Sequence, residues 1–355
     1  MDSRIVLSAV IGCALSGCSA IEFYWQGIAG QADLLARAKP MAEVIAMTAD
    51  PVLKARLVRT QAIRAFASRE LALPDNRSYT SYADLGRPFV LWNVFAAPEL
   101  SLTARQWCFP VAGCVAYRGY FAEADAREEA ARLAAAGDDV HLGGVPAYST
   151  LGYFNDAVLS TFVRYREVEL ARLIFHELAH QIVYVKDDTS FNESFATAVE
   201  EAGMERWLAA ERNTRSPAEA EELAADAARG QRLRAAFRAL IVTTRNRLTV
   251  LYASGASDDE KRAGKTAAFA EMRAAYARQK ATPEGAGAFD RWFAAGANNA
   301  GIVAAGLYAD RVPQFSALLA AEHGDFARFY GRVKTLAALP KAEREPALIA
   351  AARRD

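Results

Sequence analysis

The sequence has no excess of charge of either sign, since its 42 basic and 42 acidic residues give a formal net charge of zero. A protein that binds nucleic acid needs a basic surface to neutralise phosphates, so we expect no nucleic-acid partner. The chain also has no internal repeat and no long low-complexity tract. Apolar residues (52%) and charged residues (24%) occur at the frequencies of a globular protein. With 355 residues, the chain can bury a substantial core in one large domain or in two closely joined ones.

The N-terminus lacks an apolar run long enough to cross a membrane. The run Ile5–Leu15 has 11 residues, whereas a spanning helix needs about 20. A short apolar run preceded by a basic residue, here Arg4, is typical of an export signal. Residues 15–18 read L-S-G-C, which resembles the lipobox of bacterial lipoproteins, where cleavage leaves the cysteine, here Cys18, to be acylated. A plain secretory signal and a buried first helix are the alternatives.

From this N-terminus we expect a signal peptide at residues 1–17 and a lipid anchor on Cys18 that holds the protein on a membrane. The predicted location is the bacterial cell envelope, facing the periplasm. Ser19 favours the outer membrane, by analogy with lipoproteins in general.

Cysteine is scarce, and two of the four cysteines belong to the expected signal region. The other two, Cys108 and Cys114, are separated by five residues that include Pro110 and Gly113. In an oxidising periplasm this spacing allows a small disulfide loop, which we predict. Two buried free thiols are the alternative.

Histidine is equally scarce, yet two of the four histidines fall in one motif, H-E-L-A-H at residues 176–180. At these frequencies, chance would give H-[DE]-x-x-H only about 0.005 times in a chain of this length. On a helix, His176 and His180 lie one turn apart on the same face, so both imidazoles can reach one ion. Glu177 lies beside them, where its carboxylate can act as a general base. The alternative is a pair of core histidines on an apolar helix.

A third ligand is needed, because a catalytic zinc site takes three protein ligands and keeps one open position. Asp187 and Asp188 fall where the first helix is expected to end, in a polar turn. Glu193 is the stronger candidate, because a second helical run, with Asn192 as its N-cap, begins there and continues to about residue 208. A short antiparallel connection would let this helix face the first one. The predicted ligands of one Zn²⁺ ion are His176, His180 and Glu193.

Residues 176–181 (H-E-L-A-H-Q) and 192–196 (N-E-x-F-A) resemble the signature of gluzincin metallo-aminopeptidases. Together with the upstream segments Cys108–Cys114 and Tyr117–Tyr120, they resemble a bacterial family of zinc aminopeptidases, many with lipoprotein-like N-termini. The connection between the two motifs is shorter than in the large gluzincin aminopeptidases. The exopeptidase motif G-x-M-x-N of those enzymes is missing, and residues 152–156 are only faintly similar to it. The resemblance implies a zinc-dependent peptidase that releases N-terminal residues.

The apolar periodicity predicts a predominantly helical α+β fold. We expect an N-terminal helical segment at residues 18–75, a zincin-like catalytic core at 76–212 and a helical region at 213–355. A small mixed sheet is expected beside the H-E-x-x-H helix, because several short segments have strand character. These expected strands cover residues 89–95, 102–107, 114–121, 140–142 and 147–154. An extended peptide substrate could pair with an edge strand beside the metal, and Ala147–Gly152 is the predicted edge, with a purely structural hairpin as the alternative.

Capping signals predict a long antiparallel helical hairpin in the C-terminal half. Ser216 with Glu219 and Ser257 with Glu260 are capping boxes, and their helices extend to about residues 253 and 279. Five shorter helices should follow and pack back on the catalytic core as a wall or lid. They are expected at residues 289–295, 298–308, 313–321, 326–336 and 342–353.

These features predict a zinc aminopeptidase in which zinc activates a water molecule and Glu177 is the general base. A zinc endopeptidase of the same chemistry and a non-catalytic envelope lipoprotein with a structural zinc site are the alternatives. A donor to the oxyanion is also needed, and Tyr308 is the preferred candidate. The other candidate donors are Tyr148, Tyr153, His141 and His323. The carboxylates that could bind the substrate ammonium are Asp156, Glu200 and Glu201.

Overall fold

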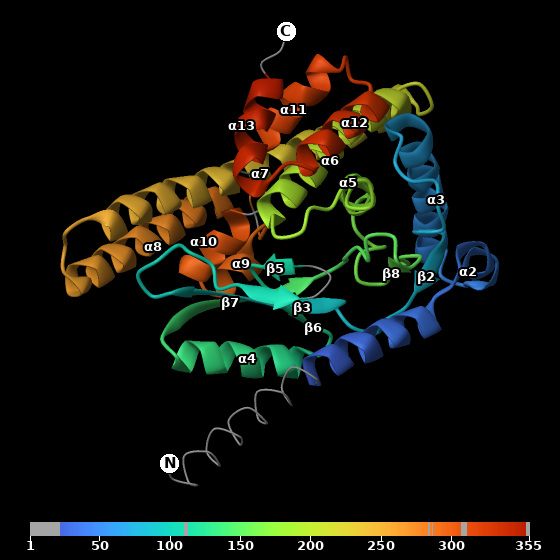
Figure 1. Ribbon diagram of the computed structural model, residues 1–355. Helices are drawn as coiled ribbons and strands as arrows, with labels where there is room; N and C mark the ends of the chain where they lie inside the picture. The colour runs from blue at the N-terminus through green and yellow to red at the C-terminus, as the bar shows by residue number, and fades with distance from the viewer. Residues whose placement is uncertain (1–21, 110–112, 283–284, 286, 307–310, 353–355) are drawn as a thin grey trace, which may run out of the picture.

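The computed structural model describes residues 22–109, 113–282, 285, 287–306 and 311–352 (Figure 1). The expected signal peptide, the expected lipid anchor at Cys18 and the candidate Tyr308 lie outside these described residues. Helices dominate and the three sheets are small, so the predicted predominantly helical α+β class is confirmed. None of the helices in the described part combines the length and apolarity that a membrane crossing requires.

The N-terminal part is helical, as predicted. It contains helix 22–37, α2 (Met41–Met47) and α3 (Pro51–Leu71). Asp50 starts α3 because its carboxylate accepts hydrogen bonds from two backbone N–H groups of the first turn, and Pro51 suits the first helical position.

The largest sheet is built around β3 (Leu91–Pro98). This strand pairs antiparallel with β6 (Arg118–Tyr120) on one side and with β7 (Asp138–Val145) on the other. Side chains alternate between the two faces of β3, and both faces are covered by helices. Trp92 faces α4 (Glu123–Ala135).

The opposite face of this sheet carries Phe95, which packs with Ala300 and Ala304 of α10 (Asn299–Gly306). Figure 1 shows α4 on one side of the sheet and α10 with α9 (Asp290–Ala294) on the other.

The two other sheets are smaller. β2 (Ser81–Ala83) pairs antiparallel with β1 (Lys39–Pro40) and parallel with β8 (Val158–Leu159). β4 (Trp107–Phe109) and β5 (Gly113–Val115) form an antiparallel pair in which Cys108 lies opposite Cys114.

Several predicted strands differ in the structure. The expected strand at residues 102–107 is mostly loop, and the one at 114–121 is divided between β5 and β6. The segment 147–154 is a turn region, so the predicted edge strand Ala147–Gly152 is wrong.

The physical reason lies in the turn itself. The Asp156 carboxylate accepts hydrogen bonds from the backbone N–H (3.1 Å) and the hydroxyl (2.7 Å) of Thr150. Leu151 and Gly152 then adopt left-handed φ values of 57° and 83°. This local bonding competes with strand pairing. In the largest sheet, the strand order β6-β3-β7 places β7 at an edge.

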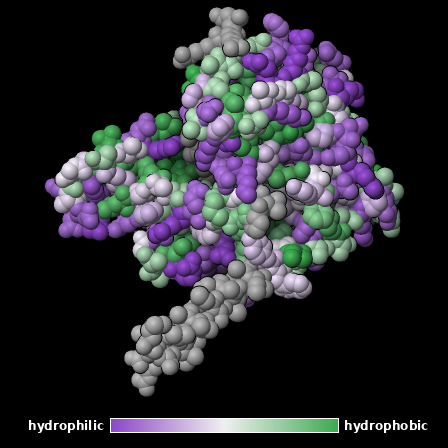
Figure 2. Space-filling model, viewed as in Figure 1, coloured by the Kyte–Doolittle hydropathy of each residue, from purple (hydrophilic) through white to green (hydrophobic). Residues whose placement is uncertain are grey.

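The C-terminal half contains the predicted hairpin, formed by α7 (Pro217–Ala253) and α8 (Asp258–Lys280). Both capping boxes are present, with the serine hydroxyl bound to the N3 backbone and the N3 glutamate bound to the serine backbone. The hairpin projects from the body in Figure 1, and the face in Figure 2 is a mixture of hydrophilic and hydrophobic residues.

The five shorter helices are confirmed, but they do not form one wall. α9 and α10 pack near the hairpin and the largest sheet, where Trp292 and Phe293 contact Phe237. Of the last three, the first packs against the helix that carries Glu193 through Phe315 and Phe191, and the second does so through Phe329 and Phe195. The third packs on these two helices. These last three are α11 (Val312–Ala321), α12 (Phe326–Ala337) and α13 (Lys341–Ala351).

Candidate metal centre

The two motif histidines lie at the end of α5 (Glu167–Ala179), with His180 as its C-cap residue. Apolar side chains repeat along one face of this helix and bury it in the main core. The Nε2 atoms of His176 and His180 face each other at 3.2 Å, as the helical spacing predicts. The buried positions of α5 are Val168, Leu170, Ala171, Ile174, Phe175, Leu178 and Ala179.

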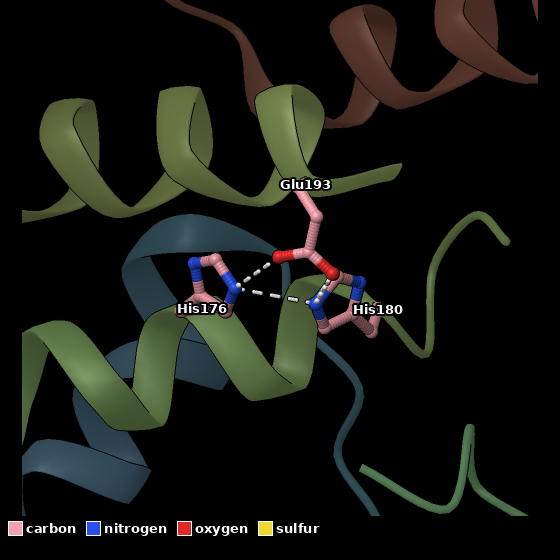
Figure 3. A group of neighbouring side chains, drawn as sticks. All are labelled: His176, His180 and Glu193. Atoms are coloured by element: carbon pink, nitrogen blue, oxygen red, sulfur yellow. Dashed lines mark hydrogen bonds and ion pairs between the residues drawn. The ribbon is translucent and has the colours of Figure 1, made fainter. Parts of the chain in front are cut away.

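Glu193 comes from the next helix, α6 (Thr189–Glu211), and points between the two imidazoles (Figure 3). Its carboxylate oxygens lie 3.3 Å from Nε2 of His176 and 3.7 Å from Nε2 of His180. The structure therefore brings the three predicted ligands together.

The start of α6 differs from the prediction. Asp188, and not Asn192, is the N-cap, and its carboxylate accepts a hydrogen bond from the N–H of Phe191. The amide of Asn192 binds back to Val185, accepting from its N–H (2.7 Å) and donating to its C=O (2.8 Å). This double hydrogen bond fixes the connection between the two ligand-bearing helices.

The three side chains fit a divalent metal ion. Their ligand atoms all lie within 4.8 Å of one another. A tetrahedral zinc site with bonds of about 2.0–2.1 Å sets neighbouring ligand atoms about 3.3–3.4 Å apart, close to the separations found here. Two imidazole nitrogens and a carboxylate oxygen are also a donor set that zinc accepts. The group can thus bind a metal ion.

His176 is held by a second carboxylate on its other ring nitrogen. Nδ1 lies 3.0 Å from Oε2 of Glu200, and Oε1 of Glu200 pairs with Arg172. Burial alone would lower the pKa of His176, but the hydrogen bonds to Glu193 and Glu200 outweigh it and raise the pKa. A carboxylate on Nδ1 fixes the tautomer that leaves Nε2 for a metal.

His180 lacks such a partner, since its Nδ1 is buried without a hydrogen bond. Burial lowers the pKa of His180 to about 4, so the ring is neutral at physiological pH. A neutral ring is the form that binds a metal ion.

Glu177 is half-buried beside the ligands. Burial raises its pKa to about 7, and the nearby charges of Glu193 and Asp156 add to this effect, while that of His176 opposes it. A carboxylate with a pKa close to the working pH is suited to general acid–base chemistry.

The candidate oxyanion donors of the described part lie in different parts of the fold, with His323 in the turn after α11. The Tyr148 hydroxyl donates to Gln31, and the His141 ring packs against Trp292 in the largest sheet region. Tyr153 is largely exposed on the turn before Asp156.

Sequence reasoning missed two tyrosines near the ligands, Tyr117 and Tyr184. Burial raises the pKa of each, and the negative charge of Glu193 raises it further. Both tyrosines are therefore within electrostatic range of Glu193. Tyr184 comes four residues after His180, the only sequence signal that could have pointed to it.

The three carboxylates considered for the substrate ammonium all have partners. Glu200 binds His176 and Arg172, and Asp156 accepts hydrogen bonds from Thr150 and Gln181. Glu201 forms an ion pair with an arginine of α7. None of the three is positioned as an open ammonium site.

The two cysteines of the β4–β5 hairpin are joined in a disulfide, Cys108–Cys114. The backbone N–H of Cys114 donates to the side chain of Asp187, which lies in the connection between the two ligand-bearing helices. The hairpin thereby supports this connection from outside the metal centre.

A family model described as "Putative aminopeptidase" matches residues 22–348. The chain belongs to this family. No curated protein and no solved structure matches it. Membership in this aminopeptidase family agrees with the peptidase class that the sequence motifs predict.

Proposed function

We propose that the protein is a zinc-dependent aminopeptidase. The observation that carries this proposal is the convergence of His176, His180 and Glu193 on one point, with Glu177 in the adjacent position of the same helix. The family description supports the aminopeptidase part of the proposal.

In this proposal His176, His180 and Glu193 hold the ion, and Glu200 and Arg172 keep the His176 ring in place. The chemistry that bound zinc supplies is Lewis-acid activation of a water molecule at the open position. Glu177 takes a proton from the attacking water as its oxygen bonds to the peptide carbonyl carbon. It then gives that proton to the leaving amine as the C–N bond breaks. Tyr117 and Tyr184, whose pKa values are raised by burial and then by the charge of Glu193, are the proposed hydroxyl donors for the developing oxyanion.

The same chemistry in an endopeptidase is the second candidate, and one observation favours it. Asp156, Glu200 and Glu201 all have partners, so no free carboxylate among them awaits a substrate ammonium. A panel of peptides with free and acetylated N-termini separates the two activities. Hydrolysis of the acetylated peptides at a comparable rate would support the endopeptidase.

A structural zinc site is the third candidate. Such a site requires the three metal ligands but does not require Glu177 as a general base. Glu177→Gln tests this, with the exposed α6 residue Glu205 changed to Gln as the matched control. We expect E177Q to retain one zinc ion per chain and to lose about 100- to 10,000-fold in kcat/KM, because the general base is gone. E205Q should behave like the unmodified protein. Unmodified protein that binds no zinc, or E177Q with full activity, would contradict the proposal.

We also propose that the protein is an envelope lipoprotein tethered through Cys18, with the outer membrane favoured. The support is the outward face of helix 22–37, where Trp25, Ile28 and Leu35 are 69%, 62% and 37% exposed. Tryptophan and apolar residues on one helix face favour a membrane interface. Four residue steps from Cys18 to Glu22 span at most about 14 Å, so an anchored Cys18 would keep this face close to lipid.

Mass spectrometry and membrane fractionation test the tether. We expect an acylated mature chain that begins at Cys18 and fractionates with the outer membrane. The difference in tryptophan fluorescence between the unmodified protein and Trp25→Phe isolates the emission of Trp25. On vesicles that contain brominated lipids, we expect this Trp25 emission to be quenched. An unmodified Cys18 or a freely soluble mature chain would exclude the tether.

A further inference from the structure

A cavity of about 350 Å³ lies between the largest sheet and the first helix of the hairpin. Its walls come from β3, β7, α7, α9 and α10, so residues far apart in the sequence form it. Most of the lining is apolar, and the size is that of a small-ligand site. The main apolar walls are Phe95, Val145, Phe237, Ile241 and Trp292.

The cavity is open because small residues face the aromatic walls. A Cβ atom on Gly143 would meet only the His141 ring, at 3.9 Å, so space remains above β7 at this position. On the other side, α10 presents Ala304 and Ala305. Larger side chains at these positions would fill the cavity.

Two polar atoms of the lining residues are buried without a hydrogen-bond partner. They are Oδ1 of Asn93 and Nη2 of Arg234. Asn93 is only 8% exposed. Because buried polar atoms in proteins are nearly always paired, two such atoms around one cavity point to a polar occupant.

The charges around the cavity are basic, although partly neutralised. Arg234 uses Nη1 to bind Glu169 (2.9 Å), which leaves Nη2 for another acceptor. Arg238 lies 3.7 Å from Glu201, a loose pair. Arg245 is the third arginine of the lining. An occupant with an anionic group would match these guanidinium groups.

The occupant must therefore combine three features: an apolar body, a donor for the Asn93 oxygen, and an anion for Arg234 and Arg238. The C-terminal residue of a peptide has all three, in its side chain, its amide N–H and its carboxylate. A fatty acid has the apolar body and the anion but no N–H donor for Asn93.

The cavity adjoins the metal centre at two places. Glu201, which pairs with Arg238, follows Glu200, which binds His176. Phe95 packs on Tyr117 with ring centroids 5.5 Å apart, and burial, followed by the charge of Glu193, raises the pKa of Tyr117. A residue released from the scissile bond can therefore extend toward this cavity.

We propose that the cavity binds the C-terminal residue of the substrate, with a bulky apolar side chain in the pocket and its carboxylate at Arg234 and Arg238. The preferred substrates are then short peptides that end in Phe, Trp or Leu. This inference rests on the proposed peptidase function. It adds a substrate class to that function.

Binding without turnover tests the cavity separately from catalysis. Calorimetry on the zinc-loaded E177Q protein should detect N-acetyl-phenylalanine, with binding about tenfold or more weaker for its amide, which lacks the charge. Arg238→Gln should remove that preference, and Gly143→Val should block binding of both probes by filling the space. Arg247→Gln, on an exposed part of α7 that pairs with Glu271, is the matched control and should bind normally.

Kinetics then connects the cavity to the reaction. The dipeptide Leu-Phe should exceed Leu-Phe-amide in kcat/KM by about tenfold or more, and R238Q should bring the ratio close to one. Equal rates for the two substrates in active wild-type protein would overturn the inference and leave the peptidase proposal intact. No hydrolysis of any peptide, together with selective N-acetyl-phenylalanine binding, would overturn the peptidase instead.

Two further results would also count against the inference. Laurate that binds while N-acetyl-phenylalanine does not would make the cavity a lipid site. A cavity that binds neither probe holds only water. If R238Q fails to fold, as judged by circular dichroism, G143V and the comparison of acid with amide still decide the question.

Discussion

Helices α6 and α7 follow each other in the sequence but depend on different forces. In α6, 13 of 23 residues are buried, whereas α7 buries 6 of 37. The packed helix carries Glu193 and Glu200, and the exposed one carries the arginines of the cavity. Burial on most sides fixes the position of α6, while α7 is held by its capping box, by ion pairs and by one narrow apolar face. One candidate metal ligand and its supporting carboxylate thus lie on the more buried helix, and the arginines of the proposed ligand cavity lie on the more exposed one.

The largest expected difference between the two helices is in stability. Phe195→Ala in α6 should lower the free energy of unfolding by about 3–5 kcal/mol, because the side chain is fully buried against Phe315, Phe329 and Tyr330. Val250→Ala in α7, where the side chain is 73% exposed, should change it by no more than about 0.5 kcal/mol. Urea unfolding followed by circular dichroism measures both. Similar losses for both variants would remove the contrast between the helices.

A smaller effect is expected where α6 supports the metal ligand. Glu200→Gln should weaken zinc affinity about 10- to 100-fold, because the uncharged amide no longer pairs with Nδ1 of His176 as a carboxylate does. Competition with a chromogenic chelator measures the affinity. Glu222→Gln on the exposed face of α7 is the control and should leave it unchanged. An unaltered affinity in E200Q would mean that Glu200 does not act through His176.

The smallest expected effect is on the pH dependence of the unfolding free energy. It arises from His141 in the sheet that faces α7. Burial lowers the pKa of His141, so the folded protein keeps this ring neutral while the unfolded chain protonates it. The unfolded state therefore binds more protons, and stability should fall as the pH drops below the unfolded value of about 6.5. His141→Gln should make this acid loss shallower. Unfolding free energies of both proteins at pH 7 and pH 5.5, in the same metal state, measure the difference, and parallel losses would exclude a contribution from His141.

The metal centre could be predicted from the sequence because nearly all of it is local. His176 and His180 are one helical turn apart, and Glu193 follows on the next helix after a short connection. The capping boxes of α7 and α8 are likewise local signals, and their helices were predicted within a few residues. The apolar periodicity also predicted α5, but this helix ends at Ala179 and not near Asp187 as expected.

The features that were predicted wrongly or missed depend on competing short-range hydrogen bonds or on residues distant in the sequence. The strand expected at Ala147–Gly152 is a turn, because the carboxylate of Asp156 binds Thr150 and the chain then adopts left-handed φ values. Asp188 is the N-cap of α6, because the side-chain oxygen of Asn192 already accepts a hydrogen bond from the backbone N–H of Val185. The cavity combines side chains of five elements, and no spacing along the chain indicates that they meet.

The two hydrogen bonds between the Asn192 side chain and the Val185 backbone have a consequence for how mutations can affect this molecule. The three candidate metal ligands, the Asn192–Val185 hydrogen bonds and the cap of α6 all lie within residues 176–193. The residues that line the neighbouring cavity, in contrast, come from remote parts of the chain. A mutation in one wall can therefore change the shape of the cavity without touching the segment that carries the candidate metal ligands.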